Sequence, residues 1–287
     1  EVSTNGREYT ASGVRFELVS LVVRGVAPWS GPALGGTVLT IAGGRLAHVG
    51  AVRCALGGAS TRWPLSAASA HGSDGVRCAS PAASATGWSS VSLSSHGAPL
   101  LSGGSFYVHG AVHVSEVVPS AGPVSGGTRV SVLGGSSFRE ASTLRCRFES
   151  SGATAAARRV GSGQLECAAP PSSSSGARRV EVSLNGQQFS VSGVAFTYRR
   201  AAAVSSVWPA RGAAEGGTPV TVLGGGFSAA AEALGALRCR LHQASVRAAY
   251  VSESALVCNT TASAAGFSAV EVSTNGREYT ASGVRFE

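Results

Sequence analysis

Short stretches of this chain alternate apolar and polar residues with a period of two. Val130 and Val132, for example, alternate with Arg129 and Ser131. Because successive side chains of a strand point to opposite faces, this pattern predicts half-buried β-strands. Helical periodicity is scarce, so the sequence predicts an all-β protein. Equivalent pairs stand in two other parts of the chain: Leu39 with Ile41, and Val220 with Val222.

The cysteines lie on such alternating segments. Cys146 has Leu144 and Phe148 two places away on either side and Arg145 and Arg147 as immediate neighbours. Period-two geometry turns the sulfur inward and the guanidinium groups outward. Cys54 and Cys239 stand in similar segments, and the remaining three cysteines each follow an apolar residue by two places: Cys78, Cys167 and Cys258.

Two cysteines in each third of the chain predict one disulfide per module, across a β-sandwich. No pair has the Cys-x-x-Cys spacing of a zinc site. Each bridge closes a loop worth roughly 3 kcal/mol and implies an oxidising compartment, whereas reduced buried thiols are the alternative. The expected bridges span 24, 21 and 19 residues: Cys54–Cys78, Cys146–Cys167 and Cys239–Cys258.

One stretch occurs twice, letter for letter. EVSTNGREYTASGVRFE fills residues 1–17 and returns at 271–287, an offset of 270 residues. The tripeptide Gly-Gly-Thr ends at Thr37, Thr128 and Thr218, in steps of 91 and 90 residues. This spacing predicts a tandem array with a 90-residue module and a three-module super-repeat. The expected modules are 18–110, 111–200 and 201–287, preceded at 1–17 by the C-terminal strands of an earlier module.

The modules follow one another with almost no linker. No Gly/Ser-rich tether separates them, so we expect stiff sandwiches stacked as a rod. Charges interrupt every apolar run before the 18 or so residues that a membrane span needs. No signal peptide is present and methionine is absent, so we expect any anchor or export signal to lie outside this segment.

A recurrent motif runs from Pro-x-x-Gly-Pro-x-x-Gly-Gly-Thr through two cysteines, the second in Cys-x-x-Pro, to Asn-Gly and a final Phe-x-Tyr. This motif resembles the IPT/TIG family of immunoglobulin-like domains, which is found in plexins, in some transcription factors and in algal and microbial surface proteins. The resemblance implies tandem immunoglobulin-like β-sandwiches. Module 1 departs at His96-Gly97 and module 3 at Gly212-Ala213. Module 2 matches throughout: Pro119, Gly122, Pro123, Gly126, Gly127, Thr128, Cys146, Cys167, Pro170, Asn185, Gly186 and Phe196.

Positive charge is concentrated in module 2. The chain carries a formal charge of +8, and residues 111–200 hold ten Arg against five acids. Solvated strand faces and contact with an acidic partner, such as a sulfated glycan, are both open interpretations. Nucleic acid fits less well, since neither a basic helix nor an aromatic platform accompanies the charge. The candidates for contact with an acidic partner are Arg158, Arg159, Arg178, Arg179, Arg199 and Arg200.

Asn259-Thr260-Thr261 is the chain's one Asn-x-Ser/Thr sequon. Alternation turns Cys258 inward and Asn259 outward, so we expect Asn259 to carry a glycan, with an unmodified surface residue as the alternative. The run Pro170-Pro171 followed by Ser172–Ser175 is typical of O-glycosylated tracts and equally of a plain loop.

The sequence offers no catalytic set. The six histidines recur at no shared module position, and Asp74 is the one aspartate. Neither a nucleophile-base-acid arrangement nor paired carboxylates can be assembled by spacing, and the glycine runs lack the Gly-Lys-Ser/Thr of a phosphate loop. We therefore expect no enzyme activity, no cofactor and no metal.

The leading functional hypothesis is a structural repeat unit of a long extracellular fibre, such as a ciliary hair, glycocalyx or cell-wall filament, with self-association or other fibre subunits as partners. Framework residues alone are shared between neighbouring modules, while the copies one super-repeat apart are identical. The second hypothesis is an adhesion or receptor ectodomain that binds a protein or acidic glycan. A DNA-binding module conflicts with the paired cysteines and the sequon.

Overall fold

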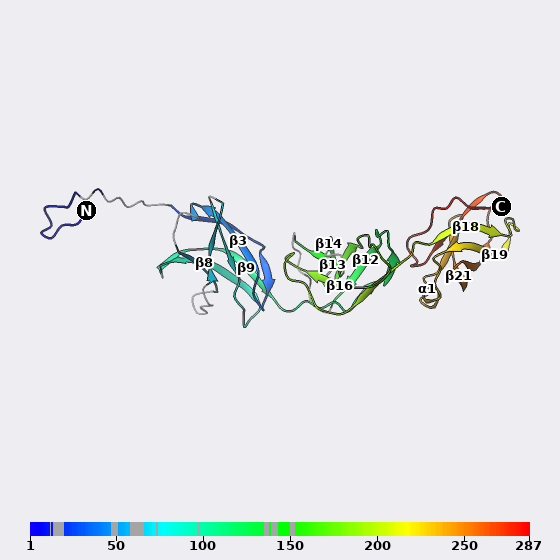
Figure 1. Ribbon diagram of the computed structural model, residues 1–287, viewed down its shortest axis with the longest axis horizontal. Helices are drawn as coiled ribbons and strands as arrows, with labels where there is room; N and C mark the ends of the chain where they lie inside the picture. The colour runs from blue at the N-terminus through cyan, green and yellow to red at the C-terminus, as the bar shows by residue number, and fades with distance from the viewer. Residues whose placement is uncertain are drawn as a thin grey trace. The chain divides into compact units, whose positions relative to one another are not determined.

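A computed structural model describes the chain except for residues 12, 14–19, 47–50, 58–65, 73, 97, 135–137, 139–142 and 150–152. The described residues are almost all in β-strands and turns, as the alternating pattern predicted (Figure 1). They divide into two compact units, Glu1–His109 and Gly110–Glu287. The first unit contains module 1 and the second contains modules 2 and 3.

The described strands of module 1 form two sheets. One has the strand order β1-β3-β7-β6 and the other β2-β9-β8-β4-β5, and neighbours are antiparallel except for the parallel pair β2 and β9. Leu39 and Ile41 of β3 face the core between them. The strands are β1 (Val22–Ala27), β2 (Ser30–Pro32), β3 (Val38–Gly44), β4 (Val52–Leu56), β5 (Ser66–Ala67), β6 (Ser69–His71), β7 (Gly75–Ala79), β8 (Gly87–Ser95) and β9 (Ala98–His109).

In module 2 the hydrogen-bonded ladder is continuous, in the order β10-β12-β15-β14-β13-β16-β17-β11. Strand β14 pairs with β15 through one part of its length and with β13 through another, so it joins the two layers of the sandwich. The strands are β10 (Glu116–Val118), β11 (Ala121–Pro123), β12 (Arg129–Leu133), β13 (Arg145–Phe148), β14 (Thr154–Gly161), β15 (Gln164–Ala168), β16 (Gly176–Ser183) and β17 (Ala195–Arg199).

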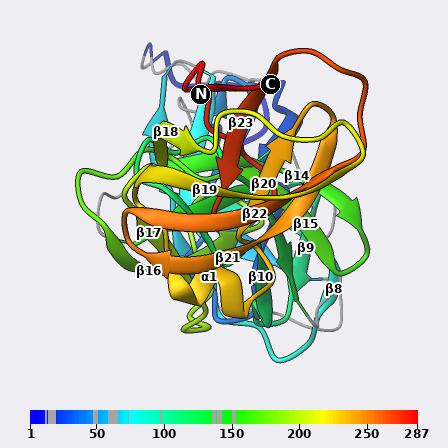
Figure 2. The same ribbon diagram turned by 90° about the vertical axis from the view of Figure 1, so that its right-hand side faces the viewer.

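Module 3 repeats this order as β18-β19-β22-β21-β20-β23-β24, with β21 in the joining role. Figure 2 shows β19, β22 and β21 running side by side. The elements are β18 (Ala203–Trp208), β19 (Gly216–Gly225), α1 (Ala229–Ala233), β20 (Arg238–Leu241), β21 (Ala244–Ser252), β22 (Ala255–Thr261), β23 (Ser268–Ser273) and β24 (Arg285–Phe286).

A disulfide crosses the core of each module, with the pairing that the sequence predicted. The bonds are Cys54–Cys78, Cys146–Cys167 and Cys239–Cys258, with Cα–Cα distances of 6.3, 6.4 and 6.3 Å. All six sulfur-bearing residues are buried among the apolar side chains of their own module. Alternation along the strands had placed these sulfurs inward, and the sandwich brings the two strands of each pair face to face.

The Gly-Gly-Thr signature has a packing reason. Gly126 has φ +75°, and a Cβ there would stand 2.6 Å from the backbone nitrogen of Pro171. A Cβ on Gly122 would stand 2.3 Å from Oγ1 of Thr128, which is fully buried. Glycine at both places therefore lets this loop close tightly under the last strand. The equivalent glycines of the other modules meet the same obstacles, which explains why the motif recurs.

The short helix α1 was not predicted. It occupies the loop between β19 and β20, follows Ser228 as N-cap residue, and buries Ala231 in the core of module 3. The segment Ala229–Leu234 is rich in good helix formers, but one helical turn is too short to show a period. Among the described residues, no helix is long and apolar enough to cross a membrane.

Candidate interaction surfaces

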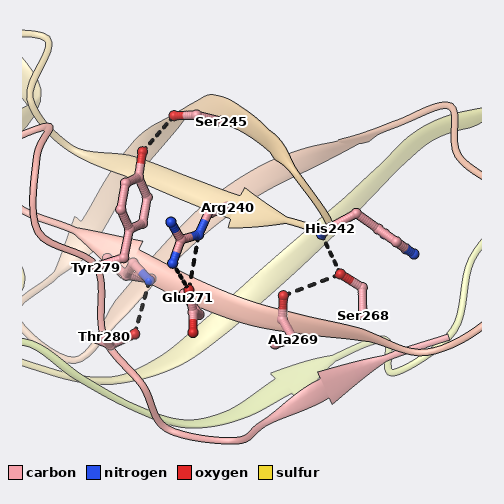
Figure 3. Close-up of polar contacts among 9 residues, drawn as sticks. Arg240, His242, Ser245, Ser268, Ala269, Glu271, Tyr279 and Thr280 are labelled. Atoms are coloured by element: carbon pink, nitrogen blue, oxygen red, sulfur yellow. Dashed lines mark hydrogen bonds and ion pairs between the residues drawn. The ribbon is translucent and has the colours of Figure 1, made fainter.

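A cross-strand cluster lies on the β20–β23 face of module 3 (Figure 3). Arg240 of β20 pairs in register with Glu271 of β23, and its Nε donates a hydrogen bond to Oε2 of Glu271 at 2.9 Å. The ring of Tyr279 covers the guanidinium at 4.3 Å, and the Tyr279 hydroxyl lies 2.6 Å from Oγ of Ser245 on β21. The hairpin between β23 and β24 is therefore held down on the sheet by an ion pair and a cation–π contact.

Module 2 repeats this cluster and module 1 lacks it. Arg147 pairs in register with Glu181, forms an ion pair with it, and lies 4.2 Å from the ring centre of Phe189. The same cross-strand register in module 1 holds Ala55 and Ser92. Comparing the modules position by position would have found this pair, since Arg follows the first cysteine and Glu stands between two valines. Nothing in one module alone signals it.

The predicted arginines of module 2 do not form one patch. Arg158 of β14 lies 3.6 Å from Glu166, and Arg179 of β16 lies 3.9 Å from Glu149. Arg178 donates hydrogen bonds to the carbonyl oxygen of Ala177 and, at 2.8 Å, to Oγ of Ser174. The doublets thus lie on different strands, and much of their charge is already paired within the module. Arg159 and Arg200 are exposed.

Arg199 belongs instead to the contact between modules 2 and 3. Its Nη1 donates a hydrogen bond to Oγ of Ser228 at 2.6 Å, just before α1. On the same contact, Oγ1 of Thr128 donates to Oε2 of Glu278 at 3.3 Å, and the Asn275 amide reaches the carbonyl oxygen of Ala121 at 3.5 Å. The β23–β24 hairpin of module 3 therefore touches the loop after β10 in module 2, so the missing linker is replaced by direct polar contacts.

A cavity of about 330 Å³ opens at the far end of module 3. Leu241, Phe286 and Thr261 line it. The equivalent place in module 2 is filled by Tyr198, which is 2% exposed, packs against Phe196 at 5.0 Å between ring centres, and donates a 2.7 Å hydrogen bond to the carbonyl oxygen of Pro170. Burial raises the pKa of the Tyr198 hydroxyl to about 12, partly offset by the charge of Arg178. Module 1 has buried Val108 at this place.

The predicted glycan sites lie on the surface. Asn259 projects outward from β22 between buried Cys258 and buried Thr260, and Thr261 is exposed on the same side. The Pro/Ser tract forms a loop between β15 and β16, and Ser173, Ser174 and Ser175 are exposed in it. Both segments are accessible to modifying enzymes.

The described residues offer no group of three or more His, Cys, Asp and Glu side chains able to hold a metal ion. The described histidines are scattered: His71 lies 3.3 Å from Arg77 in module 1, and His242 occupies a turn in module 3. His48 falls outside the described residues. The histidines, like Asp74, are not brought together with a nucleophile.

The comparisons with known proteins agree with this fold. The model of the IPT/TIG domain matches residues 21–108, 113–198 and 202–287. No curated protein matches the chain. Three solved structures illustrate the likeness of fold, all at low sequence identity and TM-score.

The extracellular region of plexin A4 is 16% identical with a TM-score of 0.48, over 92% of this chain and 23% of the plexin chain. The Escherichia coli adhesin FdeC is 15% identical with a TM-score of 0.27, over 95% of this chain and 99% of the other. The I9–I11 tandem of titin is 7% identical with a TM-score of 0.24, over 93% and 98%. This chain thus spans less than a quarter of plexin A4. Since the matched segments cover nearly all of it, the protein belongs to the IPT/TIG family and carries three of its domains in tandem.

Proposed function

We propose that this chain is a structural segment of a long extracellular fibre, such as a ciliary hair, glycocalyx or cell-wall filament, built from a 270-residue super-repeat of three IPT/TIG modules. One observation carries the proposal. The stretch that recurs identically, 1–17 and 271–287, contains the residues with which module 3 touches module 2, namely Asn275 and Glu278. An earlier copy of module 3 would present the same two groups at positions 5 and 8.

The hairpin already folds alike in both copies. Oδ1 of Asn5 accepts hydrogen bonds from the backbone nitrogens of Arg7 and Glu8 at 2.9 and 3.0 Å, and Oδ1 of Asn275 accepts the matching pair at 3.0 and 3.1 Å. A junction that depends on this hairpin can therefore be repeated unchanged every 270 residues. A fixed order of distinct faces is what a helical assembly uses, since each face meets the same partner at each period.

The cavity at the end of module 3 supports the same proposal. The first copy of the repeated stretch is followed by Leu18, whose place corresponds to Tyr198 of module 2 and Val108 of module 1. Both of those residues are buried. A large apolar residue after Glu287 would fill the cavity and continue the chain into a further module 1 without a flexible linker.

Electron microscopy of the native material tests the fibre. Antibody raised against EVSTNGREYTASGVRFE should decorate long filaments at regular axial intervals, one label for each super-repeat. Antibody against a segment of module 1 should give a second set of labels at the same interval, displaced by a constant distance. Separate particles that each bind a few antibodies, without an axial period, would contradict a fibre.

A second candidate function is an adhesion or receptor ectodomain, in which module 2 binds a protein or acidic glycan. The exposure of Arg159 and Arg200 favours it. It predicts salt-dependent retention of the recombinant chain on a sulfated-glycan column. Arg159→Ala combined with Arg200→Ala should shorten that retention, whereas Arg240→Ala, a matched loss of charge in module 3, should leave it nearly unchanged.

The three disulfides support an oxidising, extracellular setting for either function. The role proposed is mechanical or adhesive and requires no chemistry from the modules themselves.

A further inference from the structure

The outer face of the sheet β18-β19-β22-β21 in module 3 is almost without charge. Trp208 is 73% exposed there and Val251 60% exposed, at the two sides of the sheet. Between them the outward positions of β19 and β22 hold Thr221, Leu223 and Val257. The register aligns Trp208 with Thr221, and Thr221 with Val257, so these side chains form one continuous row across the sheet.

The same face of module 2 is charged. Glu166 stands where module 3 has Val257, and it pairs with Arg129 and Arg158 at 3.6 Å each. Arg158 in turn corresponds to Ala249, which is exposed on β21. Module 3 has thus replaced a network of surface ion pairs with apolar side chains on an otherwise similar sheet. Exposed apolar surface of this kind ordinarily has something packed on it.

Asn259 lies in the middle of this face. It belongs to β22, which has β19 on one side and β21 on the other, and it pairs in register with Pro219. Because outward side chains of an inner strand stand roughly perpendicular to the sheet, a group attached to Asn259 starts directly above the apolar row. Adjacent strands are about 4.8 Å apart, so Trp208 is two strands away, roughly 10 Å.

We propose that an N-linked glycan on Asn259 lies across this face and packs its first sugar rings against Trp208. The inference rests on the proposed occupancy of the sequon. A pyranose ring has an apolar C–H face that stacks on an indole and hydroxyl groups that remain in water, so a glycan covers an apolar sheet without leaving polar groups unsatisfied. The absence of charge then has a reason, since ion pairs at positions 249 and 257 would occupy the ground that the sugar covers.

The test begins with the intact chain secreted from a eukaryotic host. Mass spectrometry of the peptide containing Asn259 measures occupancy. An unmodified Asn259 would show that the glycosylation call itself is wrong, and this outcome is distinct from a glycan that is present but does not pack.

With Asn259 occupied, hydroxyl-radical labelling compares the secreted protein with Asn259→Gln, residue by residue. We expect labelling of Trp208 to be severalfold lower in the glycosylated protein and labelling of Trp88, which is 58% exposed in module 1, to be equal in both. Equal labelling of Trp208 in the two proteins would overturn the proposal. Protection of Trp208 in both proteins, with dimers seen by sedimentation, would also overturn it by showing that a second copy covers the face.

A double-mutant comparison adds a thermodynamic readout. Trp208→Ala should lower the melting temperature of the glycosylated protein by several degrees and that of Asn259→Gln by much less, because the stacking partner is already missing there. Equal effects in both backgrounds would mean that Trp208 acts without the glycan.

Discussion

Extending the chain by one residue is expected to stabilise module 3 measurably. The cavity at its end is lined by Leu241 and Phe286, and the equivalent cavity in module 2 contains the buried Tyr198. Appending Leu-Val-Ser, the sequence of residues 18–20, after Glu287 places a leucine at that position. Burying a leucine side chain contributes roughly 1.5–3 kcal/mol, against a side-chain ordering cost of about 0.5–1 kcal/mol. A net gain of about 1–2 kcal/mol is expected.

The control is the same extension with Ala-Val-Ser. It adds the same backbone and termini, so it separates the filling of the cavity from any effect of moving the terminal carboxylate away from Arg211, which already pairs with Glu287 at 2.7 Å. Leucine exceeds alanine by three carbons, and at about 0.8 kcal/mol per buried CH₂ the two extensions should differ by about 2 kcal/mol.

Hydrogen exchange resolves the effect by module. Amides of β20 and β23, which lie beside the cavity, should exchange several times more slowly with the leucine extension, while those of module 1 should not change. For a domain of about 90 residues, each kcal/mol also raises the melting temperature by about 4–8 °C. If the leucine and alanine extensions protect β20 and β23 equally, the cavity is not a seat for this side chain and the inference from Tyr198 is wrong.

Three further outcomes are expected. Module 2 should lose stability as the pH rises from about 10 toward 12, because the unfolded chain ionises Tyr198 at the ordinary pKa while the folded module holds the proton until about 12; Tyr198→Phe should remove this dependence in alkaline thermal melts. Arg240→Gln should cost module 3 roughly 1–2 kcal/mol in denaturant unfolding because Glu271 is left largely buried without its cation, and a smaller loss in Arg240→Lys would show that charge alone suffices. Replacing Cys146 and Cys167 together by alanine should cost about 3 kcal/mol from the 21-residue loop, seen as a lower urea midpoint for module 2 with modules 1 and 3 unchanged.

The sequence predicted the features that depend on local geometry. Alternation along a strand decides which side chains face inward, so the inward cysteines could be identified from the residues beside them. The Asn-Gly turn is also local: Asn5 and Asn275 make the same hydrogen bonds although Asn5 is exposed and Asn275 is buried against a neighbouring module. An Asx turn uses only the next three residues, so its sequence suffices.

Tertiary structure decided what depends on strands that are distant in the sequence. The pairing of Arg147 with Glu181 requires the register of β13 against β16, and the arginine doublets were divided among different partners by the same registers. Helix α1 formed because Ala231 packs into a core that other strands build. The uncharged row from Trp208 to Val257 exists only after β18, β19 and β22 align. Each of these features depends on a through-space neighbour, and a period along one strand carries no information about the strand that will lie beside it.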